Sequence, residues 1–165
     1  MRLGKVSDSV LKRSVLKKIK THREEVILGA ALGEDCAFLQ FEEGDVVGVT
    51  TDPVTCSKVG SGKAAIYNVT NDLAAGGAMP VAILVSALFP KKTSEDKIKA
   101  HMEEIEGVCA NLNIQIAGGH TEITDAVTRP VLTLTGIGKA KKDEISQVMP
   151  DGEEQEEYED GTMGN

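Results

Sequence analysis

The feature that most constrains the fold is an apolar run, VAILVSALF, which extends from Val81 to Phe89 between Pro80 and Pro90. The run is short for a helix and is bounded by prolines, which favours a buried strand. The stretch before it, GKAAIYNVTNDLAA from Gly62 to Ala75, has a helical composition. The sequence therefore predicts a helix followed by a buried strand.

The clearest helix of the chain follows this strand. Thr93 or Ser94 can cap it, and apolar residues then recur at spacings of three and four, namely Ile98, Met102, Ile105, Val108, Cys109 and Leu112. After it, IQIA at 114–117 and VLTLTGIG at 131–138 have the composition of strands, and we expect a long polar turn between them.

The N-terminal part predicts a short helix and a hairpin. From Ser7, apolar residues fall on one helical face, and Ser7 or Asp8 is available as the N-cap. CAFLQF and VVGVTT are typical of strands, and we expect them to pair across the turn at 42–45. The order of elements mixes a hairpin with crossover connections, so we predict an α+β fold with a mixed sheet of about four to five strands.

Composition excludes several classes of protein. The chain has 165 residues, of which 41% are apolar and 27% charged, as in one globular domain. No run approaches the length of a membrane span, and the N-terminus lacks an apolar signal core, so we expect a cytoplasmic protein without membrane contact. A net charge of -8 and only 3% aromatic residues argue against nucleic acid as a partner.

The cysteines and the C-terminus add two further expectations. Cys36, Cys56 and Cys109 are odd in number and form no C-x-x-C pair, which predicts neither a disulfide framework nor a zinc site. From 151 to 165 there are seven acidic residues and no basic one. We therefore expect one domain at 1–142 and a disordered acidic tail at 143–165.

Three aspartates are candidates for binding a metal. Asp35 in GEDC, Asp52 in TTDP and Asp72 in TNDLAAGGA each lie beside Gly, Thr or Asn, at what we expect to be the end of an element. Magnesium prefers carboxylate, phosphate and water oxygens, so carboxylates from separate loop ends suit a metal–nucleotide site. The alternative is that each is a solvated turn former or a helix cap.

Two glycine pairs are candidates for contact with an anion. Gly76–Gly77 follows the helix at 62–75, and Gly118–Gly119 lies in IAGGHTE after a predicted strand. Glycine lets backbone N–H groups approach a phosphate without an intervening side chain. Neither pair has the spacing of a P-loop or a dinucleotide fingerprint, and a helix C-cap or a turn is the alternative for each.

Together these segments resemble a known family. GEDCAFL, VTTDPV, NVTNDLAAGGAMP and IAGGHTEIT, followed by TRPVLTLTGIG, are similar to the N-terminal domain of the aminoimidazole-ribotide synthetase superfamily, over roughly 28–139. The resemblance implies a sheet covered by helices on one face, a homodimer formed through the sheets, and ATP with Mg²⁺ as cofactors. It also implies transfer of a phosphoryl group to an oxygen, often an amide oxygen.

The resemblance also assigns roles to residues. It implies Asp35, Asp52 and Asp72 as metal ligands, Asn71 and Asp72 near the phosphates, and Gly118, Gly119 and Thr121 in a loop near the nucleotide. Several relatives have an acidic residue where this chain has His120, so the fourth metal ligand is either His120 or Glu122. His120 is also the candidate acid–base catalyst, although a histidine that only forms hydrogen bonds is the commoner case.

The chain departs from the family in one respect. The family places a second α/β domain after the strand that ends near Gly138, where this chain has an acidic tail. By resemblance the chain is nearest to hydrogenase-maturation-like members, with a separately encoded C-terminal domain as a possible partner. The alternatives are a non-catalytic dimerisation or nucleotide-binding module, or a truncated fragment of such an enzyme.

Overall fold

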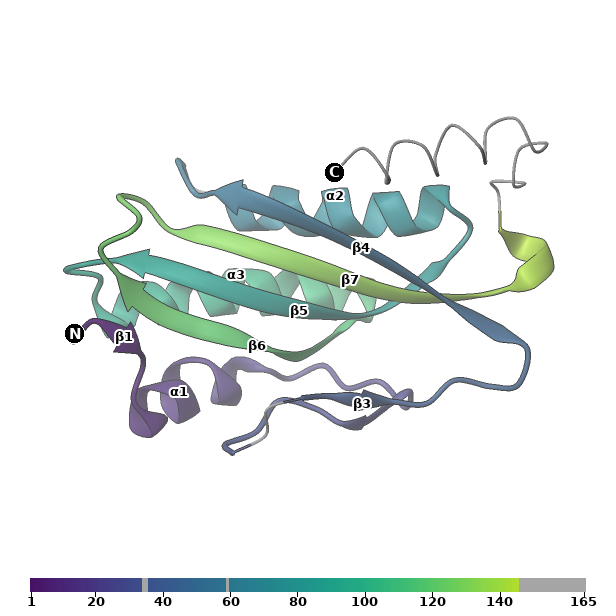
Figure 1. Cartoon of the computed structure of the whole chain (residues 1–165), viewed down its shortest axis with the longest axis horizontal. Coiled ribbons are helices and arrows are strands. Elements are labelled where there is room, and N and C mark those ends of the chain that lie inside the picture. The colour runs from purple at the N-terminus through teal and green to yellow at the C-terminus, as the bar shows by residue number, and fades with distance from the viewer. Residues whose placement is uncertain (34–35, 59, 146–165) are drawn as a thin grey trace, which may run out of the picture.

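The computed structural model describes residues 1–33, 36–58 and 60–145, and is built on a five-stranded sheet (Figure 1). The strand order is β1-β6-β5-β7-β4. The bounds are Gly4–Lys5 for β1, Gln115–Thr124 for β6, Met79–Pro90 for β5, Val131–Lys141 for β7 and Asp45–Thr55 for β4. β5 and β6 are parallel, and the other neighbours are antiparallel. The predicted α+β class and mixed sheet are confirmed.

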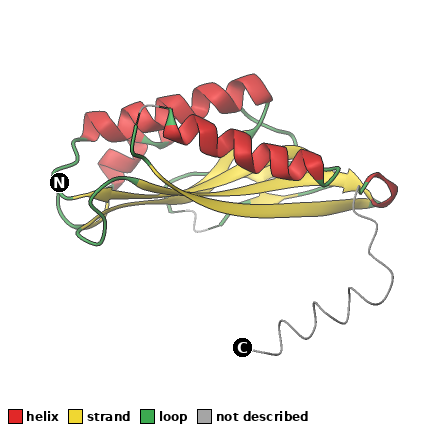
Figure 2. Cartoon of the chain, turned by 90° about the horizontal axis from the view of Figure 1, so that it is seen from above, coloured by secondary structure: helices red, strands yellow, loops and turns green. Residues whose placement is uncertain are grey.

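All three α-helices cover one face of the sheet, as predicted (Figure 2). They are α1 (Asp8–Ser14), α2 (Ser61–Ala75) and α3 (Glu95–Leu112). Two short 3₁₀ turns, η1 (Leu16–Lys18) and η2 (Lys142–Glu144), follow α1 and β7. Ser7 caps α1 and Ser94 caps α3, because each side-chain oxygen accepts a backbone N–H from the first turn. No helix among the described residues is long and apolar enough to cross a membrane.

The core lies between the sheet and these helices. The apolar run forms β5, as predicted, and Ile83 and Phe89 of this strand are almost completely buried. The apolar faces of α2 and α3 pack on it through Ile66, Ile98 and Ile105. Burial of each such side chain contributes about 1.5–3 kcal/mol, which fixes both helices over the strand.

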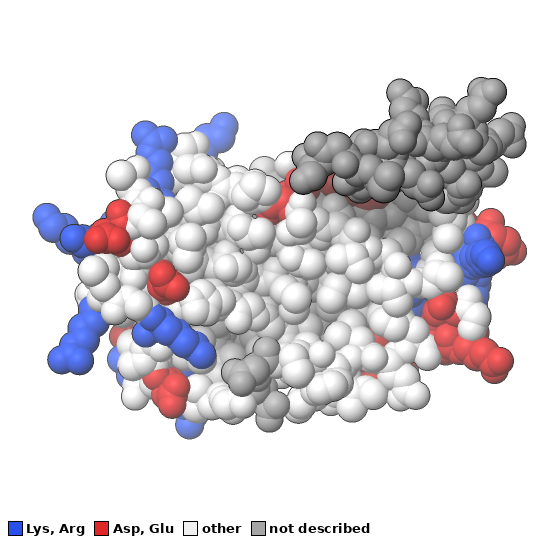
Figure 3. Space-filling model, in the orientation of Figure 1, with Lys and Arg blue, Asp and Glu red and all other residues white. Residues whose placement is uncertain are grey.

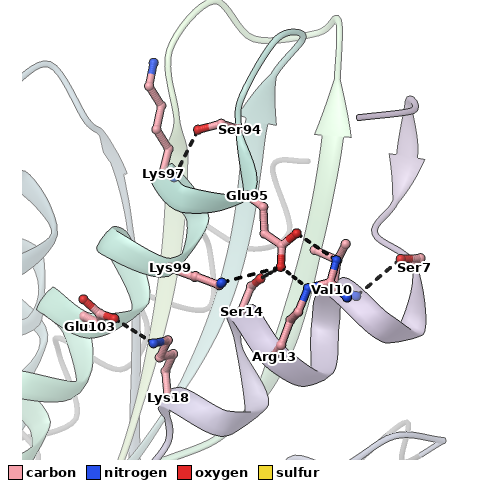
Figure 4. A network of polar contacts seen from close by, with 10 residues as sticks. All are labelled: Ser7, Val10, Arg13, Ser14, Lys18, Ser94, Glu95, Lys97, Lys99 and Glu103. Atoms are coloured by element: carbon pink, nitrogen blue, oxygen red, sulfur yellow. Dashed lines mark hydrogen bonds and ion pairs between the residues drawn. The ribbon is translucent and has the colours of Figure 1, made fainter.

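Polar contacts attach α1 to α3 (Figure 4). Glu95, the first residue of α3, accepts hydrogen bonds from the guanidinium of Arg13 and from Ser14 Oγ, the latter at 2.7 Å. These contacts lower the pKa of Glu95 to about 2. Further along, Lys18 Nζ of η1 lies 2.7 Å from Oε1 of Glu103, eight residues after Glu95 in α3. α1 and η1 are therefore each joined to α3 by an ion pair.

The predicted hairpin at 36–51 is wrong. The turn at 42–45 forms, since the Asp45 N–H donates to the Glu42 carbonyl at 3.1 Å. However, β3 (Phe38–Leu39) pairs with β2 (Val26–Leu28), and β4 pairs with β7 from Asp45↔Lys141 to Thr55↔Val131. A turn motif in the sequence predicts only a local reversal of the chain and not which strands pair. Pairing with β7 allows β4 to pack its inner face against α2.

The predicted polar turn after 117 is also wrong. β6 continues through GGHTEIT to Thr124, so the connection to β7 spans only 125–130. The polar residues of this stretch alternate with the buried Thr121 and Ile123, which is the pattern of a half-buried strand. Because the glycine pair suggested a turn, the alternation after it was not interpreted as a strand.

A buried ion cluster joins the segment before β2 to the sheet. Glu25 is only 4% exposed, and its carboxylate accepts hydrogen bonds from Arg23 Nε and Nη2 at 3.0 and 2.7 Å. Lys139 Nζ of β7 lies 2.9 Å from the same carboxylate. Chiefly through Arg23, these contacts lower the pKa of Glu25 to about 2.

The cluster predicts a pH-dependent stability. Because the pKa of Glu25 is lower in the folded chain than its ordinary value of 4.5, the ionised carboxylate stabilises the fold above about pH 4.5. This contribution is lost as the pH falls from about 4.5 to about 2. Glu25→Gln should therefore lower the free energy of unfolding near pH 6, by up to about 3 kcal/mol, and by much less at pH 2.5. Urea denaturation measures both. Glu43→Gln, at an exposed position, should have little effect at either pH; an equal loss at both pH values for Glu25→Gln would contradict the argument.

A glycine on β7 permits close packing of α2. A Cβ atom at Gly136 would lie 2.3 Å from Val69 Cγ1 and 3.1 Å from Leu73 Cδ1. Gly136→Ala should therefore destabilise the fold by about 1–3 kcal/mol. Gly107→Ala is the matched control, because nothing lies within 4 Å of its Cβ position on α3 and alanine favours helix. Thermal unfolding should show opposite shifts for the two variants.

Candidate functional site

The Gly118–Gly119 pair lies inside β6, at a bulge. The register with β5 shifts between Ile83↔Ile116 and Leu84↔Gly118. Gly119 has φ of 152°, and a Cβ there would lie 1.8 Å from the Val85 carbonyl oxygen. Only glycine fits this contact. The pair was expected in a loop; instead it brings two strand backbones unusually close together.

The residues after the glycines alternate between the two faces of the sheet. Thr121 is buried on the helix-covered side, where the core lies. His120 and Glu122 lie on the opposite face, which the helices leave open. His120 Nε2 is 2.9 Å from Glu122 Oε1, and the two side chains are 41% and 34% exposed. The two alternatives for a fourth metal ligand are therefore hydrogen-bonded to each other.

Cavities lie on both sides of the glycine pair. One of about 100 Å³ lies between α1–η1 and β6, and its walls include Gly118, Gly119, His120 and Thr121. Another, of about 370 Å³, is lined by Cys36, Ala37, Leu39 and Leu84 together with Gly118 and Gly119. Ala30 contributes to both. The three residues predicted around the nucleotide on this strand, Gly118, Gly119 and Thr121, and the candidate catalyst His120 thus all line the smaller cavity.

The predicted acidic residues lie elsewhere. Asp52 was expected at the end of an element but lies inside β4, opposite the buried Leu134 and so on the helix side. Pro53 does not end the strand, because β4 is at the edge of the sheet and needs no N–H there. Asp72 and Asn71 are exposed in the last turns of α2. Asp35 lies outside the described residues, although Gly33, two positions earlier, lines the smaller cavity.

The structure brings two of the acidic residues to the same side of the sheet. A groove of about 540 Å³ between β4 and the end of α2 is lined by Asp72 and Thr50, and Asp52 is the next residue on Thr50's face of the strand. Carboxylate oxygens of this kind fit a hard cation such as magnesium. Among the described residues, however, no three His, Cys, Asp or Glu side chains gather closely enough to form a metal site.

One copy of the chain does not unite the two groups. β6 carries the glycines and His120, β4 carries Asp52, and β5 and β7 lie between them. Three strand spacings amount to roughly 14 Å. His120 also lies on the open face, whereas Asp52 lies on the helix side. A site that used all these residues would therefore draw on more than one surface.

The open face of the sheet is largely uncharged. Figure 3 shows Lys, Arg, Asp and Glu gathered toward its two ends, with uncharged residues over much of the middle. Val47 and Val49 of β4 are 51% and 64% exposed on this face. Thr51 and Thr135 lie beside them, with their hydroxyl oxygens 3.1 Å apart. Such a patch is typical of a surface that meets another protein surface.

Part of the candidate site was not found from the sequence. Lys5 and Asp8, at the N-terminus of the chain, line the smaller cavity, and no motif marked them. Leu11 and Val15 also line it. The sequence did contain evidence for these two residues, because the apolar face of the predicted first helix had to pack against another part of the fold.

Comparisons with known proteins agree with this geometry. Residues 33–140 match the family described as AIR synthase related protein, N-terminal domain. A putative hydrogenase expression/formation protein of Methanocaldococcus jannaschii is 24% identical over 139 residues, which are 82% of this chain and 42% of that protein. A selenide, water dikinase of Pseudomonas straminea is 29% identical over 118 residues, or 69% of this chain and 32% of that protein.

Solved structures show the same fold. The hydrogenase maturation protein HypE, in complex with ATP, superposes with a TM-score of 0.71 at 17% identity, over 84% of this chain and 41% of HypE. The chain thus spans less than half the length of the relatives it matches. Because the family match covers most of the described sheet and helices, the chain belongs to the AIR synthase related proteins, as their N-terminal domain.

Proposed function

We propose that this chain is a Mg²⁺–ATP-binding domain of an AIR synthetase-related enzyme. The observation that carries the proposal is the convergence of two cavities on Gly118 and Gly119, where no side chain covers the backbone. The relative solved in complex with ATP and the relative named as a dikinase support a nucleotide as the ligand. The reaction we propose is phosphorylation of an oxygen, of the amide type, in a small or protein-bound substrate.

Asp52, Asp72 and Asp35 are the proposed metal ligands. Their carboxylates would neutralise phosphate charge through the cation, which supplies electrostatic stabilisation to phosphoryl transfer when bound. Asn71 and Thr121 are proposed to contact the nucleotide. His120, with Glu122 at 2.9 Å, is proposed as the acid–base group, because the carboxylate can orient the imidazole.

A homodimer formed through the open face is proposed as well. The uncharged open face of one copy would oppose that of a second, as the exposed Val47 and Val49 favour. Asp52 and Asp72 lie on the helix side, so the acidic residues of each copy would stay outside this interface. A second domain is a further proposed partner, since the relatives are more than twice as long as the matched region.

The nucleotide proposal predicts magnesium-dependent binding of ATP. Isothermal titration of ATP into the purified chain should show binding with Mg²⁺ and at least tenfold weaker binding in EDTA. Asp72→Asn should weaken Mg²⁺–ATP binding at least tenfold, because a hard cation loses a charged ligand.

The matched control is Asp125→Asn, an exposed loop position with the same change of charge, which should bind as the unchanged chain does. Equal binding by Asp72→Asn and by the unchanged chain would argue against the metal role. A folded, dimeric chain that binds no ATP would favour the non-catalytic dimerisation module.

The dimer proposal predicts sensitivity to charge on the open face. Val49→Asp places a carboxylate in the middle of the proposed interface and should convert dimer to monomer, as measured by sedimentation equilibrium. Leu3→Asp is the control, because Leu3 is similarly exposed, at 53%, but lies just before β1, at the edge of the sheet farthest from β4. Loss of dimer in both variants, or in neither, would contradict the assignment of the interface to the open face.

A further inference from the structure

A strap of residues, 20–25, leads from the helix side of the sheet to its open face. On the helix side, Glu106 of α3 accepts a hydrogen bond from the Lys20 N–H at 2.6 Å and another from the Thr21 N–H. Further along, Gln115 Oε1 of β6 accepts the Arg23 N–H at 2.6 Å. Side chains from two different elements thus hold the strap at successive points.

The strap ends at Glu25, where the open face begins. Arg23 donates to the Glu25 carboxylate and also, through Nη1, to the Asn113 carbonyl at 2.9 Å. Lys139 reaches the same carboxylate from the open face of β7. The Glu25 carbonyl accepts the Gln40 N–H at 2.8 Å. Both ends of the ribbon formed by β2 and β3 therefore meet at one residue.

This ribbon lies against the glycine pair. Val26, Ala37 and Leu39 pack on Ala82 and Ala117 of the sheet. Between the two strands, Ala30 lines both cavities at Gly118 and Gly119. The fit is tight, since a Cβ at Gly29 would lie 2.9 Å from Gln115 Nε2. The walls of the cavities are thus set by where the base of the ribbon is fixed.

We propose that Glu25 is a positioning residue for the nucleotide site, which it serves by fixing the ribbon over Gly118 and Gly119. The inference rests on the proposed function. The carboxylate touches no proposed ligand; it joins Arg23 and Lys139, while the backbone carbonyl of the same residue holds Gln40, so its effect passes through the ribbon. Loss of one member leaves buried partner charges uncompensated, and such a loss is more disruptive than loss of an exposed ion pair.

The test uses the full chain and Glu25→Gln at pH 7, at a temperature where circular dichroism shows both folded. Hydrogen exchange of the β2 and β3 amides should accelerate at least tenfold more than that of the α2, α3 and β5 amides, whose change reports only the lowered free energy of unfolding. Calorimetry should show Mg²⁺–ATP binding weakened about tenfold or more. Lys139→Met should shift both measurements in the same direction, and Lys139→Arg should restore them, because arginine keeps a donor to the carboxylate.

Asp45→Asn is the matched control. The Asp45 side chain is also 4% exposed and pairs with a lysine of β7, at 2.6 Å from Lys141 Nζ, but it joins β4 to β7 and not the ribbon. It should bind Mg²⁺–ATP as the unchanged chain does.

The outcomes are distinct. Unchanged ATP binding by Glu25→Gln, or equal weakening in Asp45→Asn, would overturn the positioning role while leaving the proposed function intact. Failure of the unchanged chain to bind ATP would instead overturn the proposed function, and with it the role of Glu25 toward a nucleotide. Equal acceleration of exchange in the ribbon and in the rest of the fold in Glu25→Gln would mean general destabilisation alone and would also overturn the proposal.

Discussion

The pairing of β5 with β6 on one edge and with β7 on the other is the constraint on which the rest of the structure depends. β5 is apolar on both sides, so it requires a cover on each face. α2 and α3 supply one, and the ribbon of β2 and β3 supplies part of the other. Because β6 runs parallel to β5, α3 must cross between them, and this places the glycine pair at the centre of β6 beside Val85.

Local signals in the sequence were sufficient for the elements but not for their pairing. The periodicity of α3, the caps Ser7 and Ser94 and the run from Val81 to Phe89 each report the immediate environment of a residue. Pairing of β4 with β7 depends on burial across the fold, and no turn motif encodes it. β1 and β2 are two and three residues long, too short for any period to be visible.

The candidate site was predictable in its residue types more than in its geometry. Resemblance located Gly118, Gly119 and Thr121, and the cavities include all three. It could not show that Asp52 lies inside an edge strand, or that Asp52 and His120 lie on opposite faces of one sheet. Nor did any motif mark Arg23, Glu25 and Lys139, because Lys139 of β7 lies more than a hundred residues after the other two.

The register of β4 has a consequence for the order in which the chain is made. Each β4 residue pairs with a β7 residue that lies between 76 and 96 positions later, from Thr55↔Val131 to Asp45↔Lys141. At about 5–20 residues per second, a ribosome takes roughly 4–20 s to supply that partner. Throughout that interval the nascent chain holds an eleven-residue strand with neither edge paired in the sheet. Arrival of β7, which fills the place between β5 and β4, is therefore the step that closes the fold.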